Sequence, residues 1–157
     1  IMVGEMRDMD TVSAVLRASQ TGHLVLTTFH TTDARETISS LVSYFPPHYQ
    51  PQIRAQLASN LKGVICQRLI RRKDGAGRVL AAEVLTSSPT IRACIMDPGK
   101  FEEITEHIAA GKSEYGMQTF DQSIMQLYKQ GLISYENALA NASSPADFER
   151  KIQFGGG

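Results

Sequence analysis

The sequence predicts an α/β fold: a partial parallel sheet with crossover helices, then a β-hairpin, then an all-helical C-terminal region. Three observations lead to this prediction. Residues 1–45 alternate twice between a short apolar run and a helical pattern, as in a parallel sheet with crossover helices. Two strand-like runs then flank a glycine-containing loop at 73–77, which is typical of a hairpin. After residue 88 the spacing is helical throughout. We therefore expect two parts, 1–87 and 88–157.

The first part begins as strand, helix, strand, helix. Apolar runs predict strands at 1–3, as the end of a buried strand, and at 23–29. Asp8 or Asp10 is expected to cap a helix that runs to about Gln20. The next helix covers 33–45: Asp33 and Glu36 have the spacing of a capping box, and Pro46-Pro47 ends it.

The remaining elements follow from helical spacing, caps and glycine or proline stops. Hairpin strands are expected at 64–71 and 78–86. Helices are expected at 50–62, 90–96, 101–110, 119–130, 134–142 and 145–152. The terminal glycines 155–157 are expected to be frayed.

Composition and charge are those of an ordinary soluble protein. Hydrophobic residues make up 42% of the 157, and 16 basic residues balance 16 acidic ones, so no overall field favours nucleic acid or an anionic membrane. Cys66 and Cys94 stand alone, without a zinc-type spacing, which indicates reduced thiols. No apolar run approaches the roughly 18 residues that span a bilayer. We expect a cytoplasmic protein that reaches a membrane only through partners.

The end of the first strand carries a candidate catalytic acid in Gly4-Glu5-Met6-Arg7-Asp8. In nucleoside triphosphatases with a parallel sheet, such a strand end faces the γ-phosphate. A carboxylate there polarises the attacking water or holds the magnesium shell. The alternative is that Glu5 and Asp8 only cap the next helix and offset the charge of Arg7.

The end of the second strand carries a candidate histidine. Because neighbouring parallel strands end side by side, we expect His30 to lie near Glu5. An imidazole beside a phosphate donates a hydrogen bond and senses the γ-phosphate. Thr27, Thr28, Thr31 and Thr32 supply hydroxyls around it, and we assign Thr28 and Thr31 to nucleotide binding. The alternative is a loop histidine that binds only backbone.

Two features predict that this chain is a fragment. It opens inside the apolar run Ile1-Met2-Val3, whose backbone groups would need neighbours in a sheet. It also contains no phosphate-binding loop of the form GxxxxGK[ST]. Without backbone amides to cradle phosphates, we expect the isolated chain to bind nucleotide poorly and to be inactive.

Several motifs, in order, resemble those of the type II/IV secretion ATPases, and most of all the pilus-retraction ATPases of the PilT branch. They are GEMRD, TGHLVLTTFHT, GRVLAAEVL, SPTIRACI, YGMQTFDQSI and KQGLISYENAL. The resemblance covers nearly the whole chain. It implies a partial RecA-like core from which the Walker A loop is missing, and ATP with Mg²⁺ as ligands of the full-length protein.

The resemblance also implies roles for individual residues. Glu5 matches the Walker B glutamate, the general base that activates water. His30 matches the His-box histidine near the γ-phosphate. Arg7 matches the arginine after that glutamate, which serves the active site or a subunit contact. Gly4 stands where many P-loop enzymes have a magnesium-binding aspartate, so the metal must rely on other groups and water.

A further match points to the retraction branch. Residues 90–97 align with the AIRNLIRE signature of retraction ATPases, of which this chain keeps Ile91, Arg92 and an acidic end. Ala93, Met96 and Asp97 depart from it. The chain also lacks the four-cysteine zinc insert that is usual in the extension and secretion branches.

The function implied is that of a hexameric, ATP-hydrolysing motor that retracts type IV pili and drives twitching motility, with the pilus inner-membrane platform protein as partner. Two alternatives stay open. In the first, the chain is a stand-alone interaction module whose helical part after residue 88 binds the platform protein or neighbouring subunits, without catalysis. Or the chain belongs to a motor for pilus extension or type II secretion.

Overall fold

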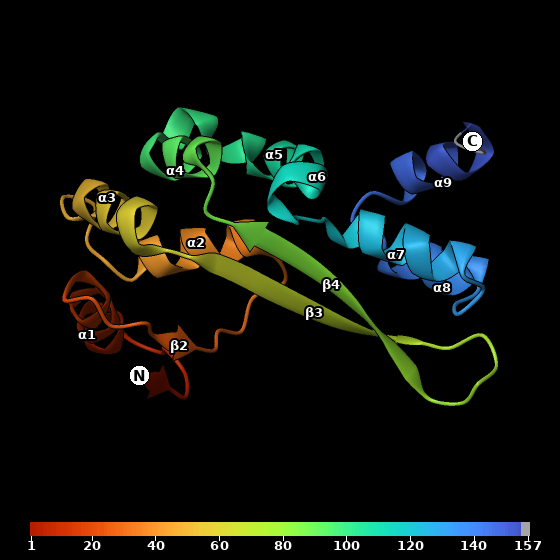
Figure 1. The fold of residues 1–157 in the computed structure, drawn as a ribbon, viewed down its shortest axis with the longest axis horizontal. Coiled ribbons are helices and arrows are strands. Elements are labelled where there is room, and N and C mark those ends of the chain that lie inside the picture. Colours follow the sequence, from red (N-terminus) through yellow and green to blue (C-terminus); the bar gives the residue numbers. More distant parts are fainter. Residues whose placement is uncertain (155–157) are drawn as a thin grey trace.

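The computed structural model describes residues 1–154 and is shown in Figure 1. Its first elements are β1 (Met2–Val3), α1 (Met9–Gln20), β2 (Leu26–Thr27) and α2 (Ala34–Ser43). β1 and β2 pair in parallel, with Met2 opposite Leu26 and Val3 opposite Thr27. The predicted parallel pairing across a crossover helix is confirmed. The terminal glycines, expected to be frayed, lie outside the described residues.

The two parallel strands are shorter and more exposed than the sequence predicts. The expected strand at 23–29 is a strand only at Leu26–Thr27. Ile1 is 60% exposed and Met2 80% exposed, so the expectation of a buried first strand is wrong. The physical reason is that each of the two strands pairs with only one neighbour within residues 1–154, so both are edge strands.

The helix starts follow the predicted caps, with one shift. Asp8 accepts a hydrogen bond from the Thr11 amide at 2.8 Å, and Asp33 accepts one from the Glu36 amide at 2.8 Å. The return bond of the expected capping box does not reach Asp33. Instead, Glu36 accepts from the amide of Thr32 at 2.7 Å. Glu36 therefore fixes the backbone at Thr32, one residue before the N-cap Asp33.

The hairpin is confirmed and runs obliquely from the middle of the molecule to its loop at the lower right of Figure 1. It follows α3 (Gln50–Asn60) and consists of β3 (Gly63–Arg71) and β4 (Arg78–Thr86), paired antiparallel along their full length. One face of β3 is buried through Cys66 and Ile70, whereas Ile65 and Leu69 point outward and are exposed. A single face of the hairpin therefore belongs to the core.

The region after the hairpin is helical, as expected. Its elements are α4 (Pro89–Met96), η1 (Pro98–Glu103), α5 (Ile104–Ala110), α6 (Lys112–Tyr115), α7 (Phe120–Lys129), α8 (Tyr135–Asn141) and α9 (Pro145–Phe154). The expected single helix at 101–110 is divided, because Asp97 caps a 3₁₀ turn at Gly99 before the α-helix begins. The short α6 was not predicted. No helix within residues 1–154 has the length and apolar character needed to cross a bilayer.

The hairpin is joined to the helices on both of its sides. Val84 and Gln118 exchange backbone hydrogen bonds of 2.8 and 3.0 Å, and the guanidinium of Arg68 lies 3.8 Å from the ring centroid of Phe120. On the N-terminal side α2 packs against both strands. The division at residue 88 stays a prediction; the hairpin contacts elements from both proposed parts.

Glu83 on β4 links the starts of two helices. Glu83 is 5% exposed as a residue. Its Oε1 accepts a 2.8 Å hydrogen bond from the backbone amide of Ala34, the first residue of α2. The amide of Phe120, the first residue of α7, is a second donor to the same carboxylate. Two helix N-termini, each with unpaired amides and a partial positive charge, therefore share one buried acid.

We predict that Glu83→Ala lowers the free energy of unfolding by about 3 kcal/mol, because it leaves buried amides without an acceptor at two helix starts. Glu83→Gln is expected to cost about 1 kcal/mol, since an amide oxygen replaces only one of the two acceptors. Urea unfolding followed by circular dichroism measures both. Equal stability of Glu83→Ala and the parent chain would contradict the assigned role.

The same residue has a predicted pH signature. Burial raises the pKa of Glu83 above its ordinary value of 4.5. Its contribution to stability is therefore fully present below that value and is lost as the pH rises through the raised pKa. The stability difference between the parent chain and Glu83→Gln should accordingly shrink from about pH 4 to pH 7. A constant difference over this range would show that the carboxyl is not perturbed.

Candidate functional site

The ends of β1 and β2 lie side by side and are connected by two hydrogen bonds, one between backbone groups and one from a side chain to the backbone. The amide of Met6 donates to the carbonyl of Thr28 at 3.3 Å. The hydroxyl of Thr28 donates in the other direction, to the carbonyl of Gly4. These bonds fix the residues that follow each strand. Glu5 and His30 therefore emerge from the same edge of the small sheet.

Glu5 is held between two cationic or potentially cationic groups. Its Oε1 lies 3.2 Å from Nε2 of His30, and its Oε2 accepts a 2.5 Å hydrogen bond from Nε of Arg7. The bond from Arg7 is the largest cause that lowers the pKa of Glu5; the charges of Arg7 and His30 act in the same direction. Glu5 is therefore a carboxylate at neutral pH. The expected proximity of Glu5 and His30 is observed.

A cleft of about 440 Å³, which we call the strand-end cleft, opens beside these side chains, between the strand ends and α2. Its lining includes the predicted residues Glu5, Arg7, His30 and Thr31, together with residues that the sequence analysis did not assign: Met6, Phe29, Glu36, Ser40, Ser43 and Tyr44. Helical spacing offers a signal for the second group, since positions 36, 40 and 44 recur every four residues on one face. The cleft is polar, with an aromatic side formed by the edge-to-face pair Phe29–Tyr44.

The loop that carries His30 is fixed from its C-terminal side. The carboxylate of Glu36 accepts hydrogen bonds from the amide and the hydroxyl of Thr32, at 2.7 and 2.5 Å. The hydroxyl of Thr31 lies 2.6 Å from that of Thr37, which is buried in α2. Together with the cap that Glu83 gives to Ala34, these bonds leave little freedom to the backbone after His30. The imidazole itself is exposed.

Three of the predicted site residues do not line the strand-end cleft. Thr28 does not line the cleft, and its hydroxyl is used between the strand ends. Ile91 is fully buried in α4, so its side chain contributes to the core. Arg92, one position later, is exposed, and its Nε donates to the hydroxyl of Ser87 at 3.2 Å. Of the proposed partner motif, only Arg92 presents its side chain to solvent.

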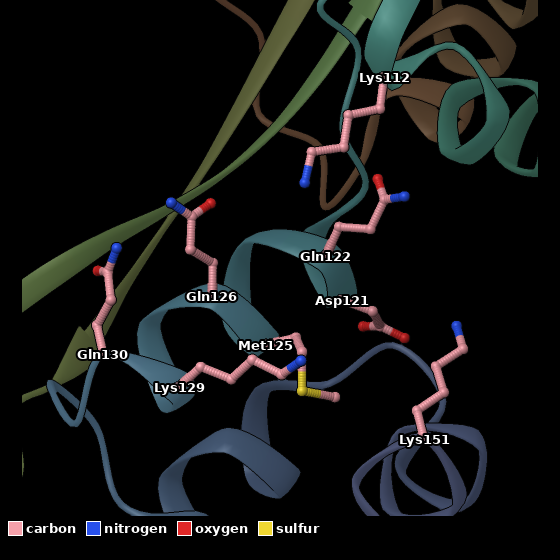
Figure 2. A pocket seen from close by; sticks show the side chains of 8 residues that line it. All are labelled: Lys112, Asp121, Gln122, Met125, Gln126, Lys129, Gln130 and Lys151. Carbon is pink, nitrogen blue, oxygen red and sulfur yellow. The ribbon is translucent and has the colours of Figure 1, made fainter. Parts of the chain in front are cut away.

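A second, larger cleft of about 760 Å³ lies among the helices of the C-terminal region (Figure 2). Lys129 and Asp121 come from α7, Lys112 from α6 and Lys151 from α9, with three glutamines and a methionine between them. Asp121 accepts a 2.7 Å hydrogen bond from the amide of Ser143. None of these lysines forms an ion pair within residues 1–154. The cleft is therefore a basic surface.

Comparison of the sequence with known protein families identifies the family of this chain. The profile of the family described as Type II/IV secretion system protein matches residues 1–140. The chain belongs to this family. Its fold is that of the family as well: the solved structure of the pilus retraction motor PilT with bound ADP superposes with a TM-score of 0.81 and 41% identity, over 96% of this chain and 41% of that one.

Within the type II/IV secretion family, the chain is PilT-like. It is 43% identical to the type IV pilus retraction ATPase PilT of Pseudomonas aeruginosa over 148 residues, which is 94% of this chain and 42% of that protein. It is 37% identical to the type IV pilus ATPase PilU of the same organism over 155 residues, or 99% of this chain and 40% of PilU. The chain thus spans about two fifths of the length of these relatives.

We predict that Arg7→Ala raises the pKa of Glu5 toward its ordinary value, because it removes the hydrogen bond and the charge that lower this pKa. A carbon-detected NMR titration of the Glu5 carboxyl measures the change. Arg17→Ala, on the exposed side of α1, is the matched control and should leave the titration unchanged. An unaltered midpoint in Arg7→Ala would exclude Arg7 as the main partner of this acid.

Proposed function

We propose that this chain forms part of an ATP-hydrolysing motor, in which the strand-end cleft receives the γ-phosphate of ATP. The single observation that supports this most is the pair formed by Glu5 and His30, with Nε2 3.2 Å from Oε1, at the ends of two parallel strands. Family membership and the likeness to PilT support the same activity. Phosphoryl transfer depends mainly on position and charge, and both are provided here.

The proposed mechanism begins with an exchange of partners. Arg7 and His30 now bind Glu5, and an incoming γ-phosphate competes for the same two donors. Transfer of these donors to phosphate oxygens frees the carboxylate of Glu5 to accept a hydrogen bond from water. The water is then oriented and polarised for attack on phosphorus, while Arg7 and His30 stabilise the charge that develops on the phosphoryl oxygens. Glu5 therefore acts as a base only when the phosphate is present.

The cleft does not by itself form a magnesium cage. Gly4 offers no carboxylate, both oxygens of Glu5 are occupied by Arg7 and His30, and Glu36 already binds Thr32. Mg²⁺ binding in such sites relies on substrate phosphates and water with few protein ligands. We propose that Mg²⁺ arrives bound to ATP, and we assign it no ligand in this chain.

The assembly that we propose is a hexamer that retracts type IV pili from the cytoplasmic side of the inner membrane. The platform protein of the pilus is its partner. Retraction is favoured over extension because the likeness to PilT and to PilU extends over at least 94% of the chain. The exposed Arg92 on α4 is available for such a contact.

The test is a chimera in which this chain replaces the matching segment of Pseudomonas aeruginosa PilT. We predict that the chimera hydrolyses ATP, and that Glu5→Gln in it lowers kcat by about 10³-fold because the amide cannot accept a proton from water. Nucleotide affinity should change by less than about threefold. Steady-state phosphate release and nucleotide titration measure the two quantities.

Glu106→Gln is the matched control, because Glu106 is an exposed acid on α5 that does not line the cleft. It should retain the kcat of the chimera. Wild-type turnover in Glu5→Gln would remove Glu5 from the mechanism. A folded hexameric chimera without ATPase activity would contradict the proposed function as a whole.

The lysine-lined cleft supports a second candidate function, that of an interaction module. Uncompensated ammonium groups on three helices favour an acidic surface of a neighbouring subunit or of the platform protein. In this role the chain binds partners without catalysis.

Calorimetry of the isolated chain tests whether the chain binds nucleotide without the rest of the protein. Because residues 1–157 contain no phosphate-binding loop, we predict that the chain alone binds ATP with Mg²⁺ more weakly than about 1 mM. Micromolar affinity of the isolated chain would show that the cleft needs no such loop, and it would disfavour a purely structural role. The chain with both Arg7→Ala and His30→Ala, which lacks the two proposed phosphate donors, is the control for heat that arises from binding elsewhere.

A further inference from the structure

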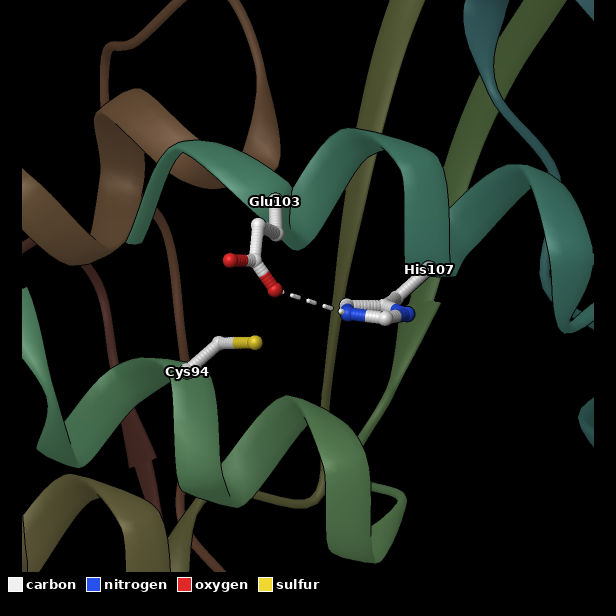
Figure 3. A group of neighbouring side chains, drawn as sticks. All are labelled: Cys94, Glu103 and His107. Atoms are coloured by element: carbon white, nitrogen blue, oxygen red, sulfur yellow. Dashed lines mark ion pairs between the residues drawn. The ribbon is translucent and has the colours of Figure 1, made fainter. Parts of the chain in front are cut away.

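The helical region brings three different metal-ligating side chains together. Cys94 lies on α4, Glu103 at the junction of η1 and α5, and His107 in the last turn of α5 (Figure 3). The sulfur, one carboxylate oxygen and one ring nitrogen all lie within 4.8 Å of one another. Nε2 of His107 is 3.5 Å from Oε2 of Glu103. None of the three lines the strand-end cleft.

We propose that these three residues bind one zinc ion. A thiolate, an imidazole and a carboxylate are the ligand types that Zn²⁺ accepts, at about 2.0–2.3 Å each. Tetrahedral coordination at these lengths separates ligand atoms by about 3.5 Å. The pair Glu103–His107 already has this separation, so only a small side-chain rotation is needed to bring the sulfur of Cys94 to the same ion.

The charge balance fits this assignment. Cys94 is 2% exposed and therefore lies beneath the other two side chains. Zinc binding replaces the thiol proton, and one thiolate plus one carboxylate neutralise the dication.

The ion has an open side. The side chains of Glu103 and His107 are 51% and 33% exposed, whereas Cys94 is buried beneath them. A fourth ligand therefore comes from solvent, as water. The effect on the fold is a cross-link between α4 and α5, two helices that pack against each other and are otherwise joined through η1. The ion thus fixes the helix that carries the exposed Arg92.

The experiment is a titration of the purified chain, reduced with a phosphine that does not compete for metal, with Co²⁺ and then Zn²⁺. We predict one equivalent of Co²⁺ with a thiolate-to-metal charge-transfer band, displaced by Zn²⁺. At 100-fold excess over its dissociation constant, Zn²⁺ should raise the melting temperature by about 5 °C or more. Mg²⁺ should give neither signal, since it prefers oxygen ligands.

Variants identify the ligands. Cys94→Ser should abolish the band, and His107→Asn and Glu103→Gln should each weaken Zn²⁺ binding at least about tenfold. Cys66→Ser is the matched control: it removes the other buried thiol, on β3, and should leave the band unchanged. His107→Asn and Glu103→Gln change exposed side chains, so they report on the site even if Cys94→Ser folds poorly.

Three results would overturn the proposal. They are no charge-transfer band at any Co²⁺ concentration, a band that persists in Cys94→Ser, or Zn²⁺ affinity that is unchanged in both His107→Asn and Glu103→Gln. Because these readouts need neither ATP nor the strand-end cleft, they are independent of the proposed motor function.

Discussion

The position of the candidate site depends on one buried carboxylate. Glu83 accepts a hydrogen bond from the first amide of α2 and interacts with the first amide of α7. α2 forms one wall of the strand-end cleft, and the loop that carries His30 leads directly into it. A helix N-terminus attracts negative charge within its first turn. A single acid on the hairpin therefore fixes the cleft wall and, at the same time, the start of α7 in the helical region.

Contacts between charged side chains also determine the electrostatics of the strand-end cleft. Glu5 has its charge compensated by Arg7 and His30, so the acid, the cation and the imidazole are mutually satisfied before any ligand arrives. Under the proposed function, a phosphate enters only by displacing an existing partner of Glu5, and this requirement favours phosphate over weaker anions. The exposed position of His30 and Arg7 keeps the cost of this exchange low, since neither is desolvated in the starting state.

Much of this arrangement could be predicted from the sequence, because it follows local rules. Parallel strands end at the same edge, which placed Glu5 beside His30. Caps at Asp8, Asp33 and Ser134 set helix starts. Contacts between distant positions could not be predicted. Glu83 lies 49 positions from Ala34, and the partner of Glu36 differs by one residue from the standard capping box. Cys94 appeared to be an isolated thiol because its neighbours Glu103 and His107 meet it only through the packing of α4 on α5.

The outward face of the hairpin also constrains how the chain behaves in concentrated solution. Ile65 and Leu69 are 68% and 62% exposed, and Leu80 lies opposite Leu69 on the neighbouring strand. An exposed apolar patch on a strand pair favours association between molecules and aggregation. Gln67 interrupts the apolar row, and Arg71 and Arg78 face each other at its end, where like charges repel an incoming strand. These polar positions therefore limit association of the chain through this face.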